Sequence, residues 1–450
     1  MSKWKRMVSL KVVLLFLLVF LAGVTIGLGR SQKVSALSNS AYDDLKVFSD
    51  VLTLLQKEYV EETKPKELIQ GAIKGMLETL DPHSAFMPPT AFKEMQEDTR
   101  GRFEGLGIEI TVKEGILTVV SPIEDTPAFK AGILAGDQIL KIEAEFTKNM
   151  TLMDAVKRLR GPKGTKVTIT IMREGLTKPG EFTLTRDVIP VRSVRHELLE
   201  KEYGYIRLSQ FQEKTDEDFG KALKALEEES KGGLKGLILD MRNNPGGLLD
   251  QAVKVADRFI DTGVIVSVEG RKEDAKTKFN AHSQGTMPPY PLVVLINGGS
   301  ASGSEIVAGA IQDHGRGILL GTQTFGKASV QTIYPLKDGS ALRLTTARYY
   351  TPSGRSIQAK GILPDIVVKP AKPEDSKEAE AVKLPSEKDL ERHLTAPEKA
   401  PPAKEKEKPK KEEVKEKEKD KKPFDNQLDR GLELLKSWEI FKKLAKGKQS

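Results

Sequence analysis

The loop at residues 297–305, NGGSASGSE, contains the best candidate for a nucleophile. Its small residues allow a sharp turn before a helix, which would raise the hydroxyl of Ser302 at the mouth of a sheet. The N-terminus of that helix would offer free N–H groups, including that of Gly303, to an oxyanion. Taken alone, however, the loop is better explained as a Ser/Gly connection with an N-cap serine. It indicates a hydrolase only if the chain also supplies a base.

The candidate base is Lys327, in the run GKASVQ. None of the five histidines stands in a Gly-x-Ser-x-Gly context or at metal-ligand spacing, and the absence of cysteine excludes a thiolate nucleophile. A lysine with a pKa of ~10.4 is neutral in about one molecule in 2,500 at pH 7. Burial would have to lower this pKa by about three units before Lys327 could accept the serine proton. Otherwise Lys327 is an ordinary solvated amine.

Strand-like runs precede two Gly-rich loops in the second half of the chain. Residues 236–240 (GLILD) lead into RNNPGG at 242–247, and residues 292–296 (LVVLI) lead into the loop that carries Ser302. Helical periodicity follows each loop, so the pattern predicts an α/β core with a mostly parallel sheet. Loops at the carboxyl ends of such strands gather at one edge, and we expect these two to be neighbours.

Other segments differ in composition and in the spacing of their apolar residues, and these differences divide the chain into six parts. Residues 38–94 have helical spacing that ends at Asp81-Pro82, while 103–187 contain short β-type runs around one helical stretch, 152–159. The predicted parts are a signal peptide or membrane anchor (1–36), a helical region (38–94), a β module (95–187), an α/β core (188–370), a charged disordered linker (371–422) and an amphipathic helix (423–450).

The two ends of the chain predict export and a solvated tail. Basic residues precede an uncharged apolar run at 12–28, the layout of an export signal, but its 17 residues also suit an uncleaved anchor. We therefore expect a periplasmic or other extracytoplasmic protein, with attachment to the inner membrane left open. Residues 396–422 hold 19 Lys, Glu or Asp among 27, too few apolar groups for a core. The helix beyond them could dock on its own chain, on a partner or on a membrane.

Several spacings together resemble the carboxyl-terminal processing proteases, also called tail-specific proteases. They are the NGGSASGSE loop, a lysine 25 residues after its middle serine, a glutamine four residues later, and the earlier DMRNNPGG run. The resemblance covers about residues 40–370 and implies a protease core of the crotonase/ClpP-like type. It implies Ser302 as nucleophile, Lys327 as base and Gln331 as the residue that holds the lysine. It also implies an oxyanion hole made by Gly303 and the Gly246-Gly247 turn, and it makes Asp313 a possible accessory residue, although a turn role explains Asp313 equally well.

The β module resembles a PDZ domain. The run EGLGIEI at 104–110 is similar to the carboxylate-binding loop of such domains, and PAFKAGILAGDQI at 127–139 is similar to their second recurring run. Successive N–H groups at Gly105, Leu106 and Gly107 could then hold a terminal carboxylate, with Ile108 opening a strand edge for the peptide. The resemblance therefore implies a protease that cleaves proteins near their C-termini. The PDZ-like domain would bind the free C-terminus of the substrate, and this binding would gate the protease activity.

Two other functions compete with this one. Residues 321–327 match a P-loop through its lysine, but Ala328 replaces the required Ser/Thr and strand-like runs follow instead of a helix. A non-catalytic PDZ scaffold would need no dyad, yet Ser302, Lys327 and Gln331 are all present. We expect no cofactor, no metal and no nucleic-acid partner. A homo-oligomer and an adaptor protein both remain open.

Overall fold

The computed structural model describes residues 39–371, apart from 114, 174, 176, 273 and 274, together with 385–396 and 425–446. It divides into two compact units at Gly75 and Met76. The first contains α2 (Asn39–Glu58) and the start of α3 (Pro65–Glu78). In the described ranges, no helix is both long enough and apolar enough to cross a membrane. The predicted signal or anchor, 1–36, lies outside the described residues.

In the second unit, α4 (Pro89–Arg100) leads into the PDZ-like domain. Pro89 suits the first helical turn, and Gly101 ends the helix in the left-handed conformation, with φ 66°. The domain's main sheet has the order β3-β4-β5-β7-β8, and β6 pairs with β5. A separate pair, β2 and β9, frames it at the chain entry and exit. The strands are β2 (Arg102–Gly105), β3 (Ile108–Lys113), β4 (Ile116–Pro122), β5 (Gln138–Ile142), β6 (Glu145–Phe146), β7 (Lys166–Met172), β8 (Gly180–Thr185) and β9 (Asp187–Pro190).

Two short helices complete this domain, α5 (Pro127–Lys130) and α6 (Leu152–Leu159). The α6 bounds coincide with the predicted helical stretch. Thr151 caps α6 by accepting a hydrogen bond from the N–H of Asp154, and Ala155 and Leu159 bury its inner face. The domain thus has a hydrophobic core of its own, in which these residues pack with side chains such as Ile139 and Ile169.

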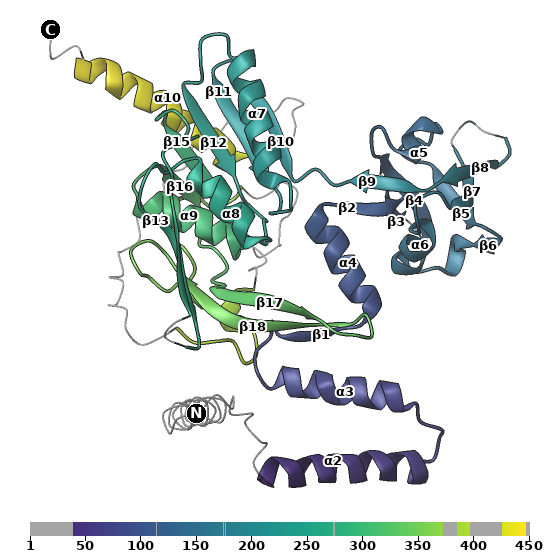
Figure 1. The fold of residues 1–450 in the computed structure, drawn as a ribbon. Coiled ribbons are helices and arrows are strands. Elements are labelled where there is room, and N and C mark those ends of the chain that lie inside the picture. Colours follow the sequence, from purple (N-terminus) through teal and green to yellow (C-terminus); the bar gives the residue numbers. More distant parts are fainter. Residues whose placement is uncertain are drawn as a thin grey trace, which may run out of the picture. The chain divides into compact units, whose positions relative to one another are not determined.

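The α/β core is built on a six-stranded sheet with the order β10-β11-β12-β15-β16-β19 (Figure 1). Only β10 pairs antiparallel with its neighbour; the other pairs are parallel, as predicted. The central strands β12 and β15 are buried at every position, which explains why their sequences are continuously apolar rather than alternating. The strands are β10 (Val194–Leu199), β11 (Tyr203–Leu208), β12 (Gly236–Asp240), β15 (Leu292–Ile296), β16 (Ile318–Gly321) and β19 (Ile366–Val367).

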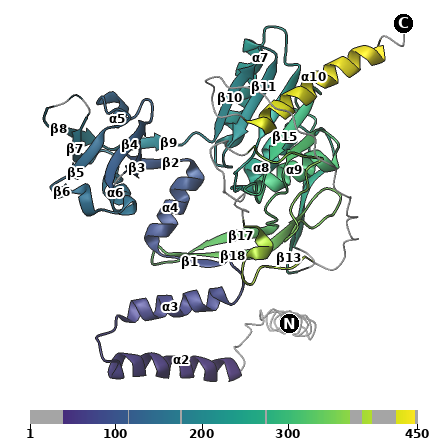
Figure 2. The ribbon, with the colours of Figure 1, turned by 180° about the vertical axis from the view of Figure 1, so that it is seen from behind.

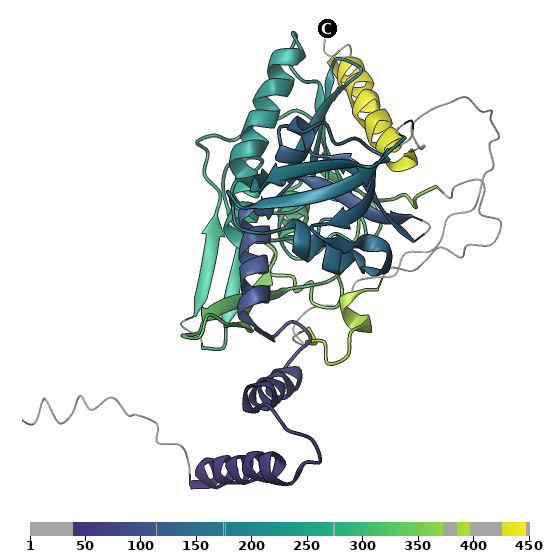
Figure 3. The same cartoon turned by 90° about the vertical axis from the view of Figure 1, so that its right-hand side faces the viewer.

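Helices cover both faces of this sheet. One face packs against α7 (Thr215–Glu229), α8 (Leu249–Asp257) and α9 (Gly303–Asp313), whereas α10 (Asn426–Lys446) covers the other (Figures 1 and 2). Leu435 of α10 is buried with Ile238 and Val293, and α7 and α10 lie on opposite sides in Figure 3. The C-terminal helix therefore docks on its own chain, one of the three expectations for it.

A second sheet carries the segment that follows Lys327. It has the order β1-β18-β13-β14, and β17 also pairs with β18. Because β17 and β18 form a hairpin directly after Lys327, no helix follows this lysine and the P-loop reading is wrong. The strands are β1 (Ala85–Met87), β13 (Val264–Gly270), β14 (Lys276–Asn280), β17 (Ser329–Pro335) and β18 (Ala341–Tyr350).

The predicted linker, 371–422, is not uniform. Residues 385–396 contain a short 3₁₀ turn, Glu387–Asp389, and Glu387 is completely buried. Its N–H donates to the carbonyl of Phe325 at 3.1 Å, next to the Lys327 turn. This ordered segment was not predicted from the sequence, because the average composition of residues 371–422 is that of a charged linker.

Candidate active site

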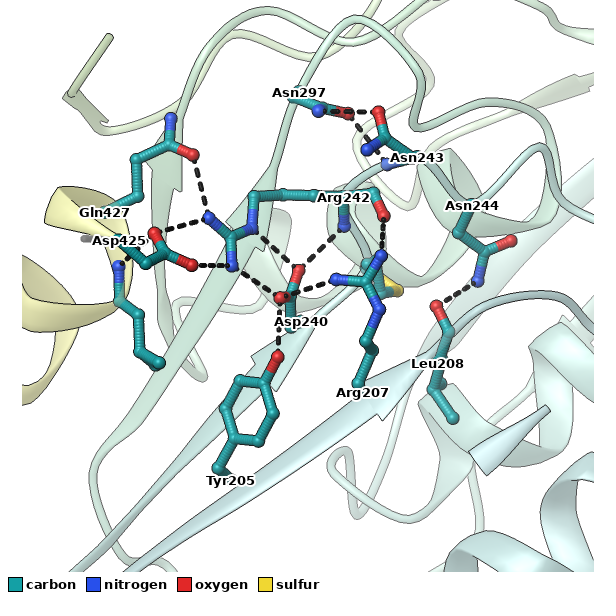
Figure 4. Close-up of polar contacts among 12 residues, drawn as sticks. Tyr205, Arg207, Leu208, Asp240, Arg242, Asn243, Asn244, Asn297, Asp425 and Gln427 are labelled. Atoms are coloured by element: carbon teal, nitrogen blue, oxygen red, sulfur yellow. Dashed lines mark hydrogen bonds and ion pairs between the residues drawn. The ribbon is translucent and has the colours of Figure 1, made fainter. Parts of the chain in front are cut away.

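The two Gly-rich loops meet beyond the carboxyl ends of β12 and β15, which confirms the expectation from the sequence. Asn243 and Asn297 exchange two hydrogen bonds of 2.9 Å, one from the N–H of Asn243 and one from Nδ2 of Asn297 (Figure 4). In addition, the hydroxyl of Ser300 donates to the carbonyl of Met241 at 2.8 Å. The loops are thus joined by polar side chains that each loop supplies.

A network of charged side chains holds the loop at 242–247. Asp240, buried at the end of β12, accepts hydrogen bonds from Tyr205, Arg207 and Arg242 (Figure 4). Arg242 also donates to Asp425 at the start of α10, at 2.7 and 2.8 Å. These hydrogen bonds hold the pKa of Asp425 below its usual range, although burial alone would raise it. The start of the C-terminal helix is therefore tied to the loop beside Ser302.

Ser302 occupies a strained turn at the N-terminus of α9. Its φ of 53° and ψ of −111° lie in a region that residues with a Cβ rarely adopt, and such strain costs about 1–3 kcal/mol. Gly246 makes the turn possible, because a Cβ on it would lie 2.8 Å from the Cβ of Ser302. A serine held this way between a strand and a helix has the geometry of a nucleophile at a sharp turn.

The structure narrows the set of oxyanion donors. Gly303 is the first residue of α9, so no carbonyl within the helix can accept its N–H. The N–H of Gly246 already donates to Oδ1 of Asn244 at 2.9 Å, so it is not available as the predicted donor. Among the described residues, no hydrogen bond engages the N–H of Gly247. Gly303 and Gly247 therefore remain as the candidate pair, and Gly246 has a steric role.

A buried carboxylate, that of Glu305, links the serine to the lysine. Its Oε2 accepts the N–H of Ser302 at 2.9 Å and the N–H of Lys327 at 3.0 Å. Its Oε1 accepts the N–H of Gly326 at 2.8 Å and the hydroxyl of Thr324 at 2.5 Å. Burial raises the pKa of Glu305 to about 7, while these four hydrogen bonds favour the ionised form.

Tyr349 of β18 makes a second link. Its hydroxyl contacts the carbonyl oxygens of both Ser302, at 3.0 Å, and Lys327. The phenol is fully buried, and this desolvation raises its pKa well above the usual value. Glu305 and Tyr349 thus fix the backbones of Ser302 and Lys327 in one frame. Sequence patterns gave no sign of Tyr349, and Glu305 stood out only as the last residue of the NGGSASGSE run.

The environment of Lys327 favours the neutral amine. Burial lowers the pKa of Lys327, and the nearby positive charge of Arg343 lowers it further. The carboxylates of Glu387, Glu305 and Asp81 act in the opposite direction but do not cancel the effect. This is the direction that a general base working near neutral pH requires.

Within the described part of the chain, no hydrogen bond joins the side chain of Gln331 to Lys327. Its side-chain amide donates to Ser329 at 2.9 Å and lies 3.4 Å from the hydroxyl of Thr345. The register of β17 against β18 shifts between Val330 and Gln331, and such a bulge redirects the side chains beside it. The role of Gln331 in holding the lysine stays a prediction.

Asp313 lies at the opposite end of α9 from Ser302. Eleven helical residues at ~1.5 Å each separate the two ends by about 16 Å. The Asp313 carboxylate instead accepts the N–H and hydroxyl of Ser353, at 2.9 and 2.6 Å, and pairs with Arg355. These contacts match the turn role that was the alternative for Asp313, and its accessory role stays a prediction.

No histidine replaces the lysine beside the nucleophile. His83 contacts Glu387, His282 pairs with Asp257, and His314 contacts the carbonyl of Val264. His393 contacts the carbonyl of Leu390, and all five histidines lie within the described residues. No hydrogen bond joins any of them to Ser302 in that part of the chain.

The predicted carboxylate-binding loop connects β2 to β3. The carbonyl of Leu106 accepts the N–H of Ala128 at 3.0 Å, and that of Gly107 accepts the N–H of Ile123 at 2.8 Å. In the described part of the domain, no hydrogen bond engages the N–H of Leu106 or Gly107. Gly107 has φ 76° and lies so close to Thr126 that a Cβ would clash with it. In the described residues, the loop after Gly105 thus uses its carbonyls in hydrogen bonds within the domain, whereas the N–H groups of Leu106 and Gly107 make none.

The strand that follows this loop has a free edge. Among the strands of the described residues, β3, which begins at Ile108, pairs only with β4 and ends the sheet on that side. Helix α6 packs near the same strand. A free edge beside a helix is the arrangement to which an extended peptide can add as one more strand.

Three family profiles match the chain. "Peptidase family S41" matches residues 202–368, "PDZ domain" matches 105–184, and "Activating protease CtpB N-terminal domain" matches 27–90. The S41 match contains both Ser302 and Lys327, and the PDZ match begins at Gly105.

Curated relatives align over most of the chain. A carboxy-terminal-processing protease of Bartonella bacilliformis is 49% identical over 80% of this chain and 82% of its own length. The carboxy-terminal processing protease CtpA of Bacillus subtilis is 37% identical over 78% of this chain and 73% of its own. A carboxyl-terminal-processing protease of Synechocystis is 38% identical over 74% and 78%, respectively.

Proposed function

The chain belongs to peptidase family S41, among the carboxy-terminal processing proteases, and from this premise we propose that Ser302 and Lys327 form its catalytic dyad. The observation that carries the proposal is the shared frame of these two residues. Glu305 accepts both of their N–H groups, and Tyr349 contacts both of their carbonyls. Such shared fixation is what a nucleophile and its base need, because their relative position must vary little.

The proposed reaction follows from this arrangement. The neutral amine of Lys327 takes the proton from Oγ of Ser302 as that oxygen attacks the scissile carbonyl. The N–H groups of Gly303 and Gly247 bind the oxyanion that forms. The Lys327 ammonium then protonates the departing amine, which leaves an acyl-enzyme ester on Ser302. Water, deprotonated by the regenerated amine, hydrolyses the ester and restores the serine.

Covalent labelling tests the nucleophile without a mutation. A fluorophosphonate reacts with an activated serine hydroxyl, so we expect one adduct per chain, located at Ser302 by peptide mass mapping. Acid-unfolded protein is the control and should not react, because the environment that activates the hydroxyl is lost. A stoichiometric adduct at a different serine in the folded protein would contradict the dyad.

We also propose that the PDZ-like domain binds the substrate's free C-terminus and thereby gates cleavage. The free edge of β3 and the N–H groups of Leu106 and Gly107 support this role. Docking there would supply the binding energy that favours the active arrangement of Ser302 and Lys327.

Amidation of a peptide's C-terminus measures this gating. Amidation removes the negative charge that the N–H groups would bind, and we expect kcat/KM to fall about tenfold or more. Gly107→Ala supplies the matched control: its Cβ would meet Thr126, distort the loop and make the free acid and the amide equally poor substrates. Equal rates for both peptides with the unmodified enzyme would exclude gating by the terminal carboxylate.

We further propose that the protein acts outside the cytoplasm. The basic N-terminus followed by an apolar run at 12–28 supports export, by a cleaved signal or with that run kept as an anchor. Fractionation of cells that express the full chain, with detection of Ser302 labelling in each fraction, tests this placement.

A further inference from the structure

A buried carboxylate behind the Lys327 turn has no part in the reaction described so far. Glu387 comes from the short segment 385–396, yet its side chain is completely buried. Burying a carboxylate is costly unless other groups compensate its charge and satisfy its oxygens. The partners of Glu387 therefore indicate what the carboxylate is for.

The contacts of Glu387 lead to residues on both sides of Lys327 in the sequence, Phe325 and Ala328. The backbone N–H of Glu387 donates to the carbonyl of Phe325, two residues before the lysine. Its Oε1 accepts Nε2 of Gln358 at 2.9 Å, and Oε1 of Gln358 accepts the N–H of Ala328, also at 2.9 Å. Gln358 is itself fully buried. Glu387 thus holds the turn on both sides of Lys327, directly and through one amide.

The same carboxylate reaches the loop between α3 and β1. Both of its oxygens lie 2.9 Å from Nε2 of His83. The carbonyl of His83 accepts Nε of Arg343, at 2.9 Å, and Arg343 is the cation near Lys327. Glu387 is therefore connected to the turn that carries the lysine and to the residue that positions a neighbouring positive charge.

We propose that Glu387 is a positioning residue for Lys327: it fixes the lysine turn through Phe325 and Gln358, and its negative charge offsets that of Arg343. The inference rests on the proposed role of Lys327 as the base. Its consequence is that segment 385–396 belongs to the active site, although it lies 60 residues after the lysine in a region of linker-like composition.

The charges around Lys327 give the sign of the expected effect. Arg343 of β18 lowers the pKa of Lys327, whereas Glu387, Glu305 of α9 and Asp81 before β1 raise it. Removing the Glu387 charge should therefore lower this pKa further. Because the base is active when neutral, activity should then extend to lower pH.

Glu387→Gln tests the charge while it keeps the shape. We expect the acidic limb of the kcat/KM profile to move down by about half a pH unit or more. Glu387→Ala also removes the side-chain hydrogen bonds to Gln358 and His83, although it keeps the backbone N–H bond to Phe325, and should lower kcat about tenfold or more with little change in KM. The matched control is Glu391→Gln, an exposed residue of the same segment, which should leave both quantities unchanged.

Each outcome decides the inference. Superimposable profiles for the wild type and Glu387→Gln would overturn it, as would a loss of kcat fully explained by a smaller folded fraction in thermal unfolding. His83→Gln is measured in parallel. If this variant shows the same shift of the acidic limb of the kcat/KM profile, the shift is due to His83 and the inference is wrong. An active Lys327→Ala variant would instead reject the proposed dyad, and Glu387 would lose its role with it.

Discussion

Replacing Ser302 by alanine should reduce proteolysis by a factor of about 10⁴ or more. The substitution removes the only atom that forms the acyl bond in the proposed mechanism. It leaves the frame around the site intact, because Glu305 and Tyr349 contact the backbone of Ser302 rather than depending on its hydroxyl. The measurement is cleavage of an unstructured protein with an apolar C-terminus, followed by intact mass.

A control at the other end of α9 separates this effect from general damage. Ser353→Ala removes the hydroxyl that donates to Asp313, about 16 Å from Ser302 along the helix. We expect its activity to remain within about twofold of the wild type, because a surface turn is affected rather than the site. Ser302→Ala should still bind a free-acid peptide. If it cleaved at the wild-type rate, another nucleophile would have to exist.

Much of the framework could be predicted because local patterns encode it. The strands at 236–240 and 292–296 and the helix at 152–159 have their predicted bounds. Continuous apolar runs between breakers identify central parallel strands, and an i, i+3, i+4 pattern identifies a helix. The approach of the two loops followed from parallel topology alone.

The supporting contacts could not be predicted, because they join residues far apart in the sequence. Glu305 accepts from Lys327, 22 residues away, and Arg242 pairs with Asp425, 183 residues away. No local periodicity records such pairs. Glu387 was concealed for a related reason: one buried carboxylate hardly changes the composition of a Lys/Glu-rich region.

Two site assignments came from the family resemblance, and the structure shows other contacts for both side chains. Asp313 lies about 16 Å from Ser302, because the eleven residues of α9 rise ~1.5 Å each, and its carboxylate contacts Ser353. Gln331 follows Lys327 by four residues in the sequence, but its side-chain amide donates to Ser329. The register of β17 against β18 shifts between Val330 and Gln331, and such a bulge has no reliable signature in a sequence of this kind.

Lys327→Ala is the second substitution with a large expected effect. Without a base, the hydroxyl of Ser302 must lose its proton to water, and we expect kcat to fall about 10³- to 10⁴-fold. The cavity left by the side chain gives the measurement a second readout. Small primary amines such as methylamine should restore part of the activity, and the rescue should grow with pH as more of the amine becomes neutral.

Lys327→Arg distinguishes base catalysis from a merely electrostatic role. The guanidinium keeps the positive charge but does not lose its proton, so this variant should be about as inactive as Lys327→Ala. In the wild type, burial and Arg343 lower the pKa of Lys327, and activity should rise with pH through a value below the usual ~10.4 of a lysine. That rise should be missing from both variants. An active Lys327→Arg enzyme would show that the site needs a cation there, and the proton from Ser302 would have to go to another group.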